Sequence, residues 1–126
     1  MGKAVQFGSD DARPILTTAW ILTEVGDAMA EPVNRPAFLR LVSWLRSSSD
    51  VEIVPCSPEL FDRGVERYAE RPDKEWSLTD CISFRVMEER GLTDALTGDH
   101  DFEQAGFVAL LSIRFAKRPI SPLQIF

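Results

Sequence analysis

Three carboxylates stand where an α/β protein could bring them together: Glu24, Asp80 and Asp99. Glu24 falls beside the apolar face of an expected helix, Asp80 lies in the first turn of another, and Asp99 follows an expected strand. Open parallel sheets bind ligands beyond the carboxyl ends of their strands, so the three acids could converge there. Such a group suits a hard divalent cation, whose bound water can attack a phosphodiester while the ion offsets the developing charge.

Each acid also has an ordinary interpretation. Ser77 and Asp80 fit a capping box, in which the carboxylate stabilises the start of a helix. Glu24 could be a solvated helix residue, and Asp99 could be a loop acid. His100 is the single histidine, and the sequence reveals no partner that would make it catalytic. Periodicity alone leaves both interpretations open.

The segments that carry these acids are expected as strand–helix units. A strand at 14–17 leads into a helix from Thr17 or Thr18 to about Ala30, which holds Glu24. A helix over 77–90 that ends at Gly91 holds Asp80, and a strand at 93–97 leads to Asp99. Further expected elements are a helix from Asn34 to about 47, a strand at 51–54, a helix beginning at 57–59, a helical turn at 101–104 and a strand at 107–111.

Helical patterns that alternate with short β-branched runs favour an α/β fold with a parallel sheet. In the helix that begins at 57–59, Phe61, Val65 and Tyr68 are expected to line the inner face. The tail after residue 114 shows no clear periodicity. The sequence therefore predicts a sheet flanked by helices, with an irregular end.

Composition narrows the class of protein. The chain has 126 residues, enough for one domain, and 44% of them are apolar. Its net charge of −6 argues against a simple basic clamp on nucleic acid, but not against an enzyme that reaches nucleic acid through bound metal. Cys56 and Cys81 make no disulfide framework, which indicates reduced thiols in the cytoplasm. No apolar run approaches the roughly 20 residues of a membrane span, and no signal peptide is expected.

Three segments resemble PIN-domain ribonucleases, and most closely their VapC-like toxin group. Residues 16–24 (LTTAWILTE) resemble the second strand and the following helix of that family. Residues 76–84 (WSLTDCISF) resemble the helix with the third acid, and residues 94–107 (DALTGDHDFEQAGF) resemble the strand, fourth acid and final strand. The resemblance covers about residues 3–111 and keeps the family's order and spacing.

The resemblance implies a three-layer sandwich with a parallel sheet over residues 1–111, followed by a tail at 112–126. It implies Mg²⁺- or Mn²⁺-dependent cleavage of RNA, with Glu24, Asp80 and Asp99 as the catalytic, metal-binding acids. Thr79 and Thr97 match positions where family members often carry a supporting hydroxyl. Asp94 and Asp101 are further nearby acids. The implied partners are RNA, a small antitoxin protein that holds the toxin inactive, and a second copy of the chain.

One departure from the family concerns the opening strand, which normally ends in Asp-Thr or Asp-Ser and brings the first acid. Residues 3–7 instead resemble the helix that precedes the second strand, so an N-terminally truncated PIN-like domain is expected. Asp10 and Asp11 follow a Gly-Ser turn and do not take the first-acid role. Loss of that central strand would leave its neighbours unpaired.

Three explanations are open, in this order of preference: a start codon assigned too far downstream, a decaying gene remnant, or a gap filled by the segment 119–126 or by a second chain. The predicted function is a PIN-family endoribonuclease of a toxin–antitoxin pair, impaired by loss of the first acid. The alternative is a non-catalytic PIN-like binding module or gene remnant. A receiver-like signalling domain would need an acid at the end of a first strand, which is not visible.

Overall fold

The protein folds around a parallel β-sheet. Its structure is a computed structural model that describes residues 14–95, 100–109 and 124–125. Within these residues the sheet has the order β2-β1-β5-β3-β4, and every pairing is parallel. The strands are β1 (Ile15–Thr18), β2 (Val51–Val54), β3 (Asp94–Ala95), β4 (Val108–Ala109) and β5 (Gln124–Ile125).

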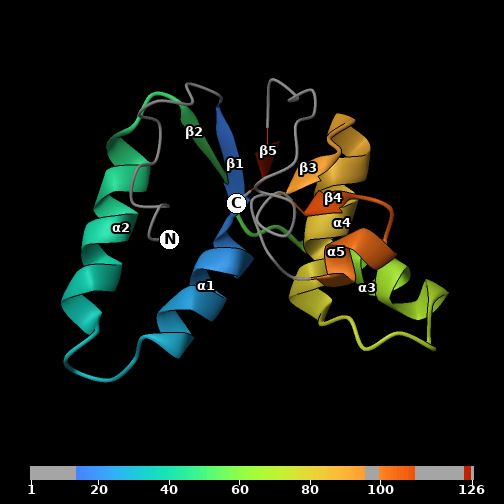
Figure 1. Ribbon diagram of the computed structural model, residues 1–126, viewed down its shortest axis with the longest axis horizontal. Coiled ribbons are helices and arrows are strands. Elements are labelled where there is room, and N and C mark those ends of the chain that lie inside the picture. Colours follow the sequence, from blue (N-terminus) through green and yellow to red (C-terminus); the bar gives the residue numbers. More distant parts are fainter. Residues whose placement is uncertain (1–13, 96–99, 110–123, 126) are drawn as a thin grey trace.

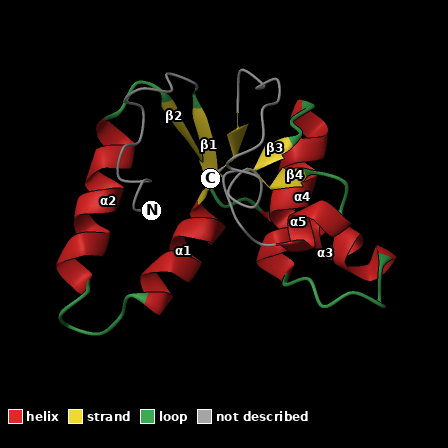
Figure 2. Cartoon of the chain, in the orientation of Figure 1, coloured by secondary structure: helices red, strands yellow, loops and turns green. Residues whose placement is uncertain are grey.

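Helices connect the strands and cover both faces of the sheet. They are α1 (Ala19–Ala28), α2 (Arg35–Ser47), α3 (Pro58–Glu70), α4 (Leu78–Arg90) and α5 (His100–Gln104). Since parallel crossovers are right-handed, α1 and α2 lie on one face and α3, α4 and α5 on the other. Figures 1 and 2 show these two groups on either side of the strands. The predicted sandwich is confirmed.

Three helices begin at the side chains that the sequence predicts. The hydroxyl oxygens of Thr18, Ser57 and Ser77 each accept a hydrogen bond from the backbone N–H three residues further on, at 3.0–3.1 Å. Such caps satisfy N–H groups that have no partner inside the helix. Helix α4 ends at Gly91, whose φ of 68° lies in the left-handed region that glycine adopts without strain.

The fifth strand lies at the centre of the sheet, and the sequence offered it only within the last of three explanations for the gap. In the expected tail, Gln124 is level with Ile15, and Ile125 is level with both Leu16 and Ala95. Strand β5 therefore pairs with β1 on one side and β3 on the other. Of the three explanations for the gap, the pairing of residues 124–125 supports the one in which part of the segment 119–126 lies there.

The core is built around Phe84 of α4, which is fully buried. Its ring meets those of Trp76 and Phe102 edge-on, with centroids 5.1 and 4.8 Å apart. Edge-to-face pairs of this kind add to the stabilisation from burial. Helix α4 buries residues on almost every side, as a helix does when other elements surround it. Asp80 therefore lies in the first turn of the helix that buries the most side chains among the described helices.

The predicted inner face of α3 was wrong. Phe61, Val65 and Tyr68 are exposed by 42%, 41% and 54%, whereas Leu60 and Gly64 are buried. A Cβ atom at Gly64 would lie 3.3 Å from the Cα of Ile82 in α4. The missing side chain thus allows the two helices to approach closely, and it turns the apolar stripe away from α4.

Candidate functional site

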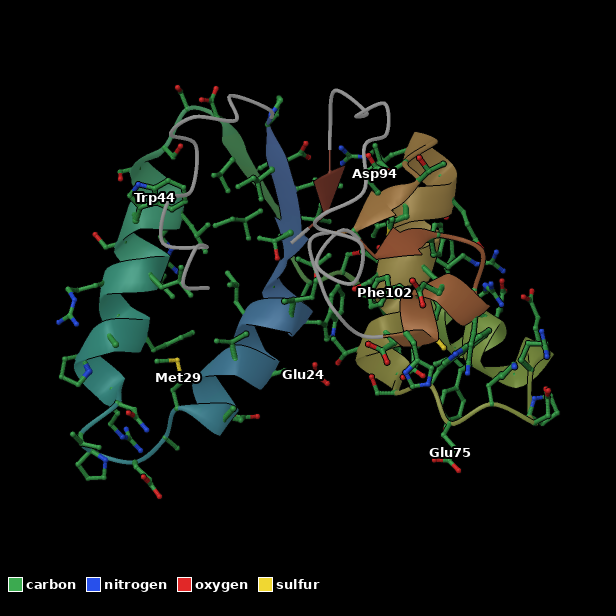
Figure 3. All side chains as sticks on the ribbon, viewed as in Figure 1. Glu24, Met29, Trp44, Glu75, Asp94 and Phe102 are labelled. Atoms are coloured by element: carbon green, nitrogen blue, oxygen red, sulfur yellow. The ribbon has the colours of Figure 1, made fainter. Side chains whose placement is uncertain are left out.

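The candidate site lies at the carboxyl edge of the sheet. Strand β1 ends there and continues into α1, whose second turn carries Glu24. Helix α4 starts at the same edge, because its other end must return to the amino edge to begin β3. Helices α1 and α4 contact each other, and Figure 3 shows Glu24 facing the half of the molecule that contains α4 and α5. Two of the predicted acids therefore belong to contacting helices at one edge.

The carboxylate of Asp80 is oriented by the start of its own helix. Its Oδ2 accepts a hydrogen bond from the backbone N–H of Ser77 at 3.3 Å, and the Ser77 hydroxyl accepts from the N–H of Asp80 at 3.0 Å. This is the predicted capping box. It holds a half-buried carboxylate at the positive end of the α4 dipole, where negative charge is stabilised. Glu24 is exposed, and its longer side chain is accessible to a ligand.

The remaining predicted site residues are distributed differently. Asp99 and Thr97 lie outside the described residues. Thr79 is half-buried in the first turn of α4, directly before Asp80, and Asp101 is half-buried in α5. These two side chains come from the elements that flank the carboxyl edge.

Asp94 occupies another level of the sheet. Ala95 and Leu16 both pair with Ile125, so Asp94 is level with Ile15 in the sheet. Strand β1 ends three residues later, at Thr18, so Asp94 lies about 10 Å from the carboxyl edge, measured along the strands. It is 1% exposed, and its Oδ1 lies 3.4 Å from the Thr93 hydroxyl, which donates a hydrogen bond to it. Figure 3 shows Asp94 and Glu24 well apart. The structure does not bring these two acids together.

A polar hollow next to α5 was missed by the sequence interpretation. It has a volume of about 480 Å³ and lies between the 71–77 loop and α5. Lys74 and Glu75 line it from the loop, and His100 and Asp101 line it from α5. His100 follows Asp99 in the sequence, so the hollow adjoins a predicted acid along the chain. No motif marks Lys74 or Glu75, because only the folded loop places them beside α5.

Glu24 and Asp80 fit a divalent cation in ligand type, since both offer the hard oxygen donors that such ions prefer. Within residues 14–95, 100–109 and 124–125, no three His, Cys, Asp or Glu side chains are grouped so that they could hold a metal ion. The described residues thus contain two of the three predicted ligands. In the same part of the chain, no helix is long and apolar enough to cross a membrane.

A parallel sheet in this order, with helices on both faces and acids at its carboxyl edge, defines a PIN-like domain. No family model matches the chain. Two relatives from Mycobacterium tuberculosis, strains CDC 1551/Oshkosh and ATCC 25618/H37Rv, are named 23S rRNA-specific endonuclease VapC20. Each is 33% identical over 107 residues, which cover 85% of this chain and 81% of the relative. The chain therefore belongs to the VapC family of PIN-domain toxin ribonucleases.

A solved structure agrees with this assignment. The crystal structure of Mycobacterium tuberculosis VapC20, described as a Sarcin-Ricin loop cleaving toxin, matches with a TM-score of 0.72 and 25% identity over 85% of this chain and 82% of that one. The fold class and the ribonuclease function predicted from the sequence are thereby confirmed. Nucleases of this family depend on a divalent metal ion, and as toxins they act on RNA and pair with an antitoxin.

Proposed function

We propose that this chain cleaves a phosphodiester bond of ribosomal RNA with Mg²⁺ or Mn²⁺ held by Glu24, Asp80 and Asp99. The observation that carries the proposal is the placement of Glu24 and Asp80 on contacting helices at the carboxyl edge of the sheet. The ribosomal substrate is suggested by relatives named 23S rRNA-specific endonucleases.

The bound ion would supply an activated water and would offset charge on the phosphate. The chain's own residues would do the positioning. The capping box holds the carboxylate of Asp80 in one orientation. The hydroxyls of Thr79 and Thr97 and the carboxylate of Asp101 would support the acids, whereas the buried Asp94 would stabilise the start of β3.

The test is cleavage of an RNA oligonucleotide with the sarcin-ricin loop sequence in Mg²⁺ or Mn²⁺, with a chelator control. Glu24→Gln should reduce the initial rate at least about 100-fold, as expected when a metal is no longer held in one geometry. Asp27→Asn is the matched control, because Asp27 is also an exposed acid of α1, one turn further along. Equal rates for Glu24→Gln and the unsubstituted protein, or cleavage that survives the chelator, would refute the proposal.

The proposal extends to partners and location. Free Cys56 and Cys81 suit the reducing cytoplasm, and an antitoxin and a second copy of the chain are the proposed protein partners.

Phe61 and Val65 form an exposed apolar strip on α3 of the kind that protein contacts cover. Sedimentation velocity of the unsubstituted protein and of Phe61→Asp would test the homodimer. A monomer at all concentrations would remove that part of the proposal.

A further inference from the structure

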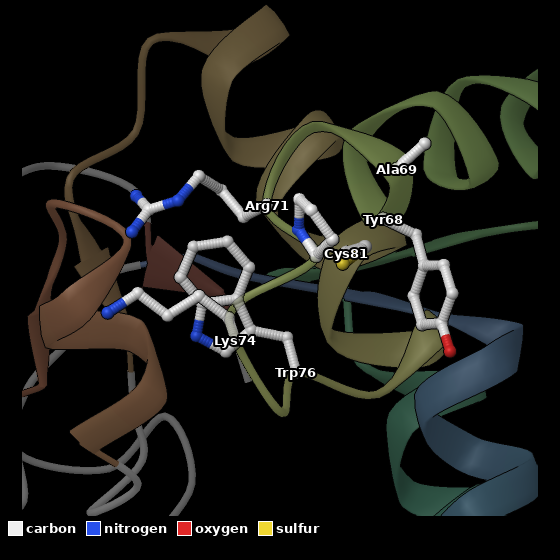
Figure 4. A pocket seen from close by; sticks show the side chains of 7 residues that line it. Tyr68, Ala69, Arg71, Lys74, Trp76 and Cys81 are labelled. Atoms are coloured by element: carbon white, nitrogen blue, oxygen red, sulfur yellow. The ribbon is translucent and has the colours of Figure 1, made fainter.

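A second hollow lies on the other side of the 71–77 loop. It has a volume of about 470 Å³, within the range of small-molecule sites, and lies between the end of α3 and the start of α4. Tyr68, Arg71, Lys74, Trp76 and Cys81 are among its lining residues (Figure 4). Lys74 also lines the polar hollow beside α5. Lys74 therefore lines both hollows.

The two aromatic side chains that line this hollow differ in exposure: Trp76 is buried and held in place, whereas Tyr68 is exposed. Trp76 is only 4% exposed, and its Nε1 donates a hydrogen bond to Oε1 of Gln104 at 3.2 Å. The Trp76 ring is further held edge-on against Phe84. Tyr68 is 54% exposed, so its ring is accessible to a flat ligand.

The cations of the hollow differ in their availability. The guanidinium of Arg71 lies 5.8 Å from the centre of the Trp76 ring and donates two hydrogen bonds to Asp73, at 2.9 and 2.8 Å. That pairing lowers the pKa of the Asp73 carboxyl to about 2. By contrast, no hydrogen bond or ion pair joins the Lys74 ammonium to another residue in the described part of the chain. Lys74 is thus the cation at this place that is available to an anionic ligand.

We propose that this hollow binds an unstacked base of the RNA substrate, next to the nucleotide that is cut at the acidic edge. The base lies against the ring of Tyr68, and its phosphate contacts the ammonium of Lys74. Aromatic stacking and a backbone cation are the two means by which proteins hold single-stranded RNA. This inference rests on the proposed function, since it places the neighbouring nucleotide at the acids.

The ammonium of Lys74 favours RNA over an apolar protein segment as the occupant of the second hollow. A hollow for an apolar protein segment would gain nothing from an available lysine, whereas the phosphate of RNA pairs with it. In a chain of net charge −6, binding to RNA needs such local cations rather than a broad basic surface.

The test is the dissociation constant for a fluorescent RNA oligonucleotide of the sarcin-ricin loop, measured in chelator so that no cleavage occurs. Tyr68→Ala should weaken binding about 5- to 150-fold, the range expected for one lost stacking contact, and Tyr68→Phe should restore it. Leu39→Ala is the control, since this side chain is 64% exposed on α2 and does not line the hollow. Lys74→Ala should weaken binding and lower the salt slope by about one ion, and Lys74→Arg should retain both.

Cleavage kinetics with metal provide a second readout. Tyr68→Ala should raise KM and leave kcat near that of the unsubstituted protein, whereas Glu24→Gln should lower kcat. Unchanged RNA affinity in Tyr68→Ala would overturn the inference, as would failure of the unsubstituted protein to bind the oligonucleotide. A change in sedimentation for Tyr68→Ala, with RNA affinity intact, would assign the hollow to a protein partner instead. Loss of the proposed function would appear separately, as absent metal-dependent cleavage.

Discussion

Asp80 has two possible roles, and substitution can separate them. Its Oδ2 accepts the N–H of Ser77, which stabilises α4, and its charge is proposed to hold a metal ion. Asp80→Asn keeps an oxygen that can accept the same hydrogen bond but removes the charge. The loss of charge at the positive end of the helix should cost about 0.3 to 1 kcal/mol of folding free energy.

Ser77→Ala is the matched variant. It removes the hydroxyl that accepts from the N–H of Asp80 at 3.0 Å and leaves the carboxylate in place. Loss of a cap of this kind costs about 1 kcal/mol. Ser77→Ala should therefore melt about 3 to 6 °C below the unsubstituted protein, and Asp80→Asn about 1 to 6 °C below it.

Their activities should differ where their stabilities do not. Well below the melting temperature, Asp80→Asn should cleave RNA at least about 100-fold more slowly, because the metal loses a charged ligand. Ser77→Ala should stay within several-fold of the unsubstituted protein. Initial rates at 25 °C and melting curves by circular dichroism provide the comparison. If both variants lose activity in proportion to their stability, Asp80 acts only as a helix cap.

Three further predictions concern stability and reactivity. Gly64→Ala should lower the free energy of unfolding in urea by about 1 to 2 kcal/mol, because overpacking against Ile82 outweighs the gain in helix propensity; increased stability would contradict the close approach of α3 and α4. Ile125→Pro should cost about 1 to 3 kcal/mol, because a backbone N–H is lost from a strand paired on both sides; an unchanged urea midpoint would show that β5 is not part of the sheet. A maleimide should modify exposed Cys56 in the native protein and Cys81 only in urea, because Cys81 is buried and its burial raises the pKa of the thiol. Equal labelling of both thiols in native protein, measured by mass spectrometry, would refute this.

Local signals in the sequence predicted the starts of the helices well. A hydroxyl side chain before an apolar run satisfies backbone N–H groups within three residues, so the capping positions Thr18, Ser57 and Ser77 can be identified without knowledge of the fold. The left-handed cap at Gly91 is equally local. For the same reason Asp80 could be placed in the first turn of its helix.

Features that depend on distant segments were predicted only in part or not at all. Strand β5 has two residues, too few for an alternating pattern, and its existence depends on unpaired edges of β1 and β3 far away in the sequence. The face of α3 that packs was misjudged because Gly64 carries no apolar signal, although its small size decides where α4 lies. Lys74 lines two hollows because of the path of its loop in the folded protein, and the sequence carries no signal for that path.

Strand β5 also affects the proposed site, because it separates β1 from β3. Neighbouring strands lie about 4.8 Å apart, so an intervening strand places β1 and β3 about 10 Å apart. Helix α1 follows β1 directly, and α4 leads into β3, so the intervening strand contributes to the separation of the two helices that carry Glu24 and Asp80. On this argument the central strand helps to position the helices of the proposed metal ligands as well as pairing within the sheet, and its loss should reduce cleavage even under conditions in which the helices remain folded.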